Sequence, residues 1–277
     1  MERTASDIQI VRLIQRNREI DSGLPRWARR TNPIVRRQLG VAWRTMLPET
    51  RFLWQAFVVQ SILILLTIPF PFLMDLTVPT ITASILLMPL VIYLYGRALL
   101  LIGMAATQSI TDELKNDTLN ILRATPFSLN EIIGSKAAAA VWRQVEDLGL
   151  LLVAAALMST PVLISYYAGM WSLDEHPLVT RSAVILGLAV SILRMMIEPM
   201  MVALVGVAMG ATFKTRAAGV VAMIICGGFY FLLVNLSRFI PVEWPLKFLL
   251  DFALPIVLPF VVMGGALWLA RYLLERS

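Results

Sequence analysis

The chain has 277 residues, of which 58% are hydrophobic and only 15% charged. With a mean hydropathy of +0.75, these proportions predict a membrane protein rather than a soluble domain. One Cys and one His exclude a disulfide framework and a His-rich metal cluster, and no metal site is predicted. No segment fits the P-loop pattern G-x-x-x-x-G-K-[ST], so any use of ATP must come from a partner chain.

The formal net charge of +6 arises in residues 1–51, which hold eleven Arg and five acids. Within this predicted cytoplasmic arm, Asn32 as N-cap and Pro33 at the first helical position predict a helix over about 33–47. Three Arg lie on one side of this helix and a Trp at its apolar edge: Arg36, Arg37, Arg44 and Trp43. We expect an amphipathic helix on the inner leaflet, with a purely orienting role for its charge as the alternative.

Apolar stretches of about 20 residues predict membrane spans, because that length crosses a hydrocarbon core of roughly 30 Å. Six such stretches form an all-α transmembrane domain over residues 52–272. The predicted spans are about 52–74, 78–108, 147–168, 182–212, 217–237 and 252–271. The segment 238–251 between the last two is open to two interpretations, a hairpin dipping into the outer interface or an ordinary amphipathic loop.

The distribution of Lys and Arg predicts the orientation of these spans. If both termini are cytoplasmic, the inner segments carry nineteen Lys and Arg and the outer segments three. We therefore expect a multi-pass protein of the cell (inner) membrane with both termini inside.

Residues 110–136, between the second and third predicted spans, form the second cytoplasmic structure. Apolar residues at helical spacing predict a short helix that Pro126 interrupts. Ser128 and Glu131 then form a capping box, with Phe127 and Ile132 at the two staple positions. The sequence predicts a helix, a sharp corner and a second helix.

This segment resembles the signature E-x-x-x-G-T-L-E-x-L-x-x-T-P-x-S-x-x-E-I-x-x-G-K of type-2 ABC exporter permeases. The matching residues are Glu113, Thr118, Leu119, Leu122, Thr125, Pro126, Ser128, Glu131, Ile132, Gly134 and Lys136. Two positions depart from it, Asp117 where Gly is usual and Asn120 where Glu is usual. The resemblance also includes residues 32–39, the six predicted spans and the internal position of both termini. It therefore covers essentially the whole chain.

The resemblance implies a permease subunit whose coupling helix docks onto a separate ATP-binding subunit. The residues that the resemblance assigns to coupling are Glu113, Asp117, Thr118, Leu119, Thr125, Pro126, Phe127, Ser128 and Glu131. Two ATP-binding subunits and a second permease copy or paralogue are the implied partners, in a lipid bilayer and without nucleic acid. ATP and Mg would be bound by the partner, and this chain itself would hold no cofactor and perform no covalent chemistry.

Three charged residues fall inside the predicted spans: Arg97, Arg194 and Glu198. Arg194 and Glu198 are one helical turn apart, so we expect an ion pair that faces the protein interior or a watery cavity. Two interpretations of this pair are open. In the first it belongs to a substrate pathway or to a latch at a dimer interface, and in the second it is purely structural. An ion-gradient-driven secondary transporter that uses this pair is the alternative function, although no internal repeat is visible.

Overall fold

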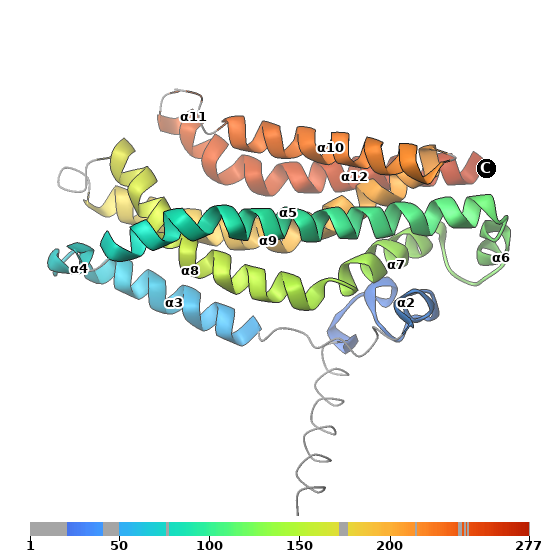
Figure 1. Cartoon of the computed structure of the whole chain (residues 1–277), viewed down its shortest axis with the longest axis horizontal. Coiled ribbons are helices and arrows are strands. Elements are labelled where there is room, and N and C mark those ends of the chain that lie inside the picture. Colours follow the sequence, from blue (N-terminus) through green and yellow to red (C-terminus); the bar gives the residue numbers. More distant parts are fainter. Residues whose placement is uncertain are drawn as a thin grey trace, which may run out of the picture.

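The computed structural model describes residues 21–40, 50–75, 78–171, 177–213, 215–237, 240, 242 and 244–276. Every regular element within these residues is helical. The elements are η1 (Arg26–Ala28), α2 (Pro33–Leu39), α3 (Thr50–Leu66), α4 (Phe72–Asp75), α5 (Val78–Lys115), α6 (Leu119–Arg123), α7 (Leu129–Trp142), α8 (Val145–Met170), α9 (Pro177–Thr212), α10 (Arg216–Leu236), α11 (Trp244–Phe248), the π-helical turn η4 (Leu249–Ala253) and α12 (Leu254–Arg276). The long helices run roughly along one axis, with α2, α6 and α7 at one end and α4 and α11 at the other (Figure 1).

Five helical stretches in the described residues are long and apolar enough to cross a membrane, which indicates a multi-pass membrane protein. Four of them are α5, α8, α9 and α10, and the fifth runs from Leu246 in α11 through η4 and α12 to Arg276. Each contains most of one predicted span. α5 continues past the predicted end at residue 108 to Lys115 and has 38 residues, or about 57 Å.

The first predicted span, residues 52–74, is not a single helix. α3 ends at Leu66 and has 17 residues, or about 25 Å, which is shorter than the hydrocarbon core. Two prolines follow, Pro69 and Pro71, and these lack the backbone N–H that a continuing helix needs. The separate short helix α4 comes after them. Hence the length of α3 alone does not confirm a sixth span.

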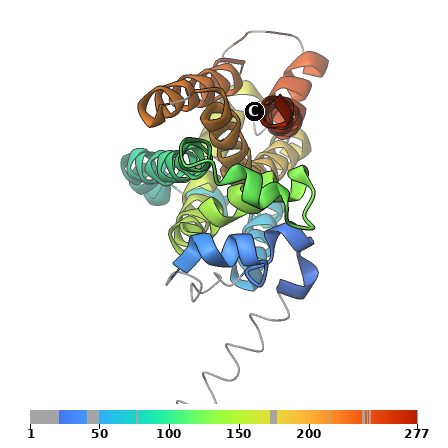
Figure 2. The same cartoon turned by 90° about the vertical axis from the view of Figure 1, so that its right-hand side faces the viewer.

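The predicted amphipathic helix over 33–47 is helical as α2 from Pro33 to Leu39. Gly40 ends it with a positive φ of 54°, while Trp43 and Arg44 lie outside the described residues. Val35 and Leu39 are buried in one cluster with residues of α7, so that protein covers this side of α2. Figure 2, which views this end of the bundle, shows the N-terminal helices beside α7.

α9 is the central helix of the bundle. It packs against α3, α5, α7, α8, α10 and α12. One buried cluster joins its second half to α5, α7, α10 and α12, and another joins its first half to α3, α8 and η4. These six helices are therefore positioned by their contacts with α9.

The approach of α9 to α5 depends on two glycines one turn apart. A Cβ on Gly206 would lie 2.6 Å from the backbone oxygen of Gly103, and one on Gly210 would lie 2.5 Å from that of Thr107. Real Cβ atoms do not come so close to a backbone oxygen. Small residues at this spacing let two membrane helices pack backbone against backbone.

Buried polar groups join the elements at the α4 end. Arg181 of α9 donates from Nε to Thr67 Oγ1 at 2.7 Å and from Nη2 to the Thr67 carbonyl at 3.0 Å. Lys247 of α11 lies 3.4 Å from Asp251 of η4, and both side chains are buried. The segment 238–251 therefore contains a short helix, α11, and it contacts the bundle where Asp251 accepts from the Tyr166 hydroxyl of α8 at 3.5 Å.

We predict that Gly210→Ala lowers the free energy of unfolding by about 1–3 kcal/mol, because the added methyl forces α5 and α9 apart. The measurement is unfolding in mixed detergent micelles followed by circular dichroism. Gly228→Ala on α10 is the matched control, since no atom lies within 4 Å of its added Cβ. There the helix propensity of Ala gives an unchanged or slightly higher stability, and equal losses in the two variants would contradict the packing argument.

Candidate functional site

The turn that follows α5 is held in an unusual backbone conformation. Asp117 has a φ of 52°, and it is the single non-glycine residue with positive φ in the described part of the chain. Asp tolerates this left-handed region better than most residues, although Gly adopts it most easily. The position where the permease signature has Gly is therefore one where the backbone favours Gly.

Thr118 and Leu119 begin the short helix α6 directly after this turn. The Thr118 N–H donates to the Glu113 carbonyl at 3.1 Å, which closes the turn onto the end of α5. Thr118 is the N-cap of α6, without a hydrogen bond from its side chain to the helix. At the other end of α6, the Thr125 hydroxyl donates to the Leu122 carbonyl at 2.5 Å.

The corner between α6 and α7 contains the predicted capping box. The Glu131 N–H donates to Ser128 Oγ at 3.3 Å, and the Ser128 N–H donates to Glu131 Oε2 at 2.9 Å. The backbone and hydroxyl hydrogen bonds from Ser128 lower the pKa of the Glu131 carboxyl. The prediction of a capped second helix is confirmed, with Pro126 exposed at the corner and Phe127 half-buried.

A buried ion pair fastens α7 to the end of α5. Lys136 Nζ lies 2.5 Å from Glu113 Oε1 and donates to the Ser109 carbonyl at 3.2 Å. The Lys136 side chain has no exposed surface. Burial lowers the pKa of Lys136 because the desolvation of its ammonium outweighs the attraction of Glu113. The corner is thus closed by a charge pair that only the folded arrangement brings together.

The N-terminal segment is fixed to α7 by hydrogen bonds as well as by apolar contacts. Asn32 accepts from the Ile34 N–H at 2.9 Å, as predicted for an N-cap, and donates to Ser135 Oγ at 3.2 Å. Trp142 Nε1 donates to the Ala28 carbonyl at 2.8 Å. The Trp27 ring covers Gly134, where an added Cβ would meet ring carbons at 3.1 Å.

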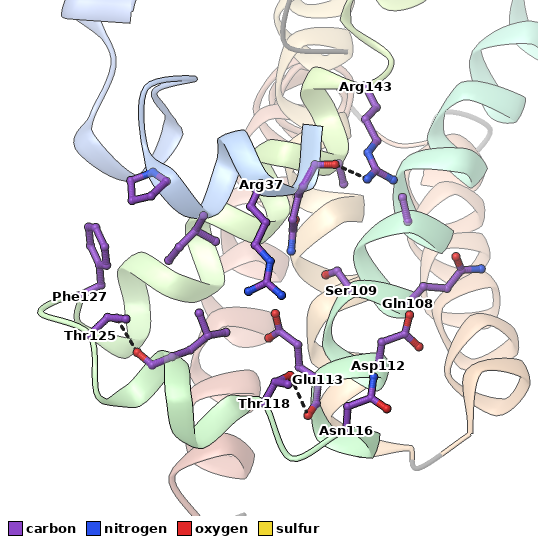
Figure 3. A pocket seen from close by; sticks show the side chains of 16 residues that line it. Arg37, Gln108, Ser109, Asp112, Glu113, Asn116, Thr118, Thr125, Phe127 and Arg143 are labelled. Carbon is purple, nitrogen blue, oxygen red and sulfur yellow. Dashed lines mark hydrogen bonds between the residues drawn. The ribbon is translucent and has the colours of Figure 1, made fainter. Parts of the chain in front are cut away.

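These elements enclose a cavity of about 470 Å³ between α2, α5, α6 and α7 (Figure 3). Four of the predicted coupling residues line it, together with Arg37 and Arg143: Glu113, Thr118, Thr125 and Phe127. The Arg37 guanidinium points into the cavity toward Glu113, whose Oε2 is buried without a hydrogen-bond partner. Arg36 is exposed on α2 and is not among the lining residues.

A second polar cluster lies inside the bundle, at Glu198 of α9. Glu198 is 1% exposed and forms the expected ion pair with Arg194. Tyr95 of α5 donates to Glu198 Oε2 at 2.8 Å, and Tyr230 of α10 donates to Oε1 at 3.0 Å. Three donors from three helices therefore surround one buried carboxylate.

This cluster borders a largely apolar cavity of about 240 Å³ between α5, α8, α9 and α10. Tyr95, Arg194 and Glu198 are among the residues that line it. Arg97 does not reach it. This third charged residue of the predicted spans lies on a separate groove between α5 and α8.

Several partners of these residues were not among the predicted site residues. Tyr95, Tyr230 and the pairing of Lys136 with Glu113 depend on contacts between distant parts of the sequence. Tyrosines are common in membrane spans, so the sequence pattern did not mark Tyr95 and Tyr230 as site residues. Lys136 matched the permease signature, which marked its position but not its partner.

Comparison of the chain with family models, with curated proteins and with solved structures gives no match. Within the described residues, no group of three or more His, Cys, Asp and Glu could hold a metal ion. The functional interpretation therefore depends on the geometry described above and on the sequence resemblance.

We predict that Glu113→Gln destabilises the chain more than the pair of substitutions Glu113→Gln and Lys136→Met together. The single variant leaves a buried ammonium without its carboxylate, a change that costs about 3–5 kcal/mol in buried pairs, and the second substitution removes that charge. Thermal unfolding of all four members of the double-mutant cycle measures the difference. Additive losses would contradict the buried pair.

We also predict that the loss of stability caused by Glu113→Gln becomes smaller as the pH rises. Burial already lowers the pKa of Lys136 in the wild type, and removing the attraction of Glu113 lowers it further in the variant. Between these two lowered values the folded variant binds fewer protons than its unfolded chain while the wild type does not, so the stability of the variant rises with pH relative to the wild type. A pH-independent loss would show that the ammonium charge is not its cause.

Proposed function

We propose that this chain is the transmembrane permease subunit of an ATP-binding cassette exporter. The observation that carries the proposal is the rigid corner at residues 113–136, where the residues of the permease signature meet. Asp117 supplies the turn, Ser128 and Glu131 cap the second helix, and Lys136 locks it to Glu113. The hydrogen bonds hold this corner in one conformation, as is needed for a segment that transmits a movement, whereas a flexible loop would absorb it.

The corner is well placed to pass on a movement. A partner that pressed on α6 and on the start of α7 would push on α5 through the Glu113–Lys136 pair. α7 is followed almost directly by α8, with residues 143 and 144 between them. Movement of one corner would thus reach two of the long apolar helices, which suits the hinge-like motions that open transport pathways.

The proposal includes six spans, with α3 as the first, in the cell (inner) membrane and with both termini cytoplasmic. It places α2, α6 and α7 on the cytoplasmic side, where the Lys and Arg of the connecting segments concentrate. Two such permeases, as identical copies or paralogues, would enclose the substrate path. Two separate subunits would bind ATP and Mg.

The test is purification of the tagged chain from its native membranes, followed by ATP turnover of the complex in nanodiscs. We expect a co-purified subunit that carries a P-loop, and we expect Phe127→Ala and Glu131→Ala to lower turnover. Glu131→Ala removes the carboxylate that accepts from the Ser128 N–H, and the loss of one such hydrogen bond costs about 1 kcal/mol, or roughly fivefold in the population of the ordered corner.

Two variants serve as matched controls in this experiment. Glu131→Gln keeps a capping-box residue and should retain turnover. Trp268→Ala removes an aromatic ring that is exposed on α12 and does not line the cavity at the corner. Absence of any P-loop subunit, or wild-type turnover in both test variants, would refute the proposal.

A secondary transporter is the second candidate, favoured by the buried cluster at Glu198. A carboxylate surrounded by Arg194, Tyr95 and Tyr230 beside a cavity is an arrangement that ion-coupled carriers use, since intramembrane acids often belong to ion pathways. Inverted vesicles loaded with a panel of lipophilic dyes separate the two candidates. An exporter of the first kind moves dye with ATP and Mg, whereas a carrier moves it under an imposed pH gradient without ATP.

The double variant Arg194→Leu with Glu198→Leu tests the pathway role of this cluster in the same vesicles. The paired removal leaves no lone buried charge, so the fold should persist. We expect dye movement to fall while thermal stability stays within about 1–2 kcal/mol of the wild type. Unchanged transport would show that the ion pair is purely structural.

A further inference from the structure

A groove between α5 and α8 opens on the outside of the bundle. It has a volume of about 270 Å³ and is lined by Leu94, Arg97, Ala98, Leu101, Gln144, Asp147, Leu150 and Leu151. Arg97 and Asp147 are both exposed, and neither has an ion-pair partner in the described part of the chain. The groove therefore offers one cation and one anion, each with free hydrogen-bonding capacity.

Arg97 lies within the predicted span 78–108, but the uncharged part of α5 that precedes it is by itself nearly long enough to cross a bilayer. Residues 78–96 of α5, before Arg97, are uncharged and span about 28 Å. Residues 148–170 of α8, after Asp147, are also uncharged. Since the hydrocarbon core is roughly 30 Å thick, both helices meet their first charge near the same boundary. A charged groove at this level lies within reach of lipid headgroups.

We propose that this groove binds the headgroup of a zwitterionic phospholipid with a primary ammonium, such as phosphatidylethanolamine. A guanidinium matches a phosphate in geometry and charge, which assigns Arg97 to the phosphate. The Asp147 carboxylate then accepts from the ammonium. With Arg97 and Asp147 both ionised the two charges cancel, so a zwitterion fits better than an anionic lipid.

The remaining lining residues suit the other parts of such a lipid. Leu94, Leu101, Leu150 and Leu151 provide apolar walls for the start of the acyl chains. Gln144 is the N-cap residue of α8, but its side chain makes no capping hydrogen bond, so its amide is available to the glycerol esters. A volume slightly below the roughly 300 Å³ of small ligand sites holds a headgroup but not a whole lipid.

This site depends on membrane insertion and not on an ATP-binding partner. The proposed orientation has the end of the bundle with α2, α6 and α7 on the cytoplasmic side. The groove then lies in the inner leaflet. Failure of lipid binding would leave the permease proposal untouched, because that proposal is tested by ATP turnover.

Native mass spectrometry of the purified chain, with phosphatidylethanolamine, phosphatidylcholine and phosphatidylglycerol added in turn, tests the proposal. We expect roughly tenfold tighter retention of phosphatidylethanolamine than of phosphatidylcholine, since methylation removes the ammonium donors that Asp147 accepts. Asp147→Asn should bring this ratio close to one and raise the retention of phosphatidylglycerol. Arg97→Gln should weaken all three lipids, and Arg97→Lys should restore part of the binding.

Arg271→Gln and Glu275→Gln are the matched controls, because these residues form an exposed ion pair on α12. Neither should change the lipid ratios. Soluble glycerophosphoethanolamine serves as the competitor without acyl chains, and we expect it not to displace the lipid. Equal retention of the three lipids, a ratio unaffected by Asp147→Asn, or displacement by the soluble competitor would each overturn the assignment.

Discussion

The close packing of α9 against α5 is the constraint on which the rest of the structure depends. Gly206 and Gly210 bring the two backbones together, and α9 then contacts most of the other long helices. In a bilayer the apolar effect does not drive helices together, so close van der Waals contact has to provide the association. The arrangement of the candidate sites follows from this contact, since α5 contributes to all of them.

Buried charge is the second constraint, and the chain meets it by pairing each such group with partners from other turns or helices. Lys136 has Glu113 and the Ser109 carbonyl, Glu198 has Arg194 and two tyrosines, and Arg181 has both oxygens of Thr67. A lone charge in such surroundings is expensive, whereas a pair with further hydrogen bonds is tolerated. Polar side chains thereby fix which helix faces meet, because a rotated helix would leave them unpaired.

The sequence predicted the features that depend on local chemistry. The N-cap at Asn32, the capping box at Ser128 and Glu131 and the i, i+4 pair of Arg194 and Glu198 are all present. Each of these interactions joins residues at most four positions apart, so spacing alone specifies it. The positions of the five long apolar helices followed from hydropathy, which is likewise a property of consecutive residues.

The features that the sequence did not predict depend on packing between distant residues or on local breaks. Tyr95 and Tyr230 reach Glu198 from other helices, and nothing in their spacing marks them. The end of α3 at Leu66 is an example of a local break. Hydropathy predicted one continuous span over this uncharged stretch, but Pro69 and Pro71 divide it. The groove at Arg97 and Asp147 likewise required the α5–α8 contact, since the two residues lie fifty positions apart in the sequence.

The single helix α5 joins three of the places where polar side chains gather. Glu113 near its end holds the corner, Arg97 near its middle faces the groove, and Tyr95 reaches the buried Glu198. Arg97 and Tyr95 are only two residues apart, so their side chains leave different sides of the helix. A rotation or shift of α5 that moved Tyr95 relative to Glu198 would also move Arg97 relative to Asp147. Since the corner is fastened to the same helix, a force on the corner would act on the internal cluster and on the groove at Arg97 together.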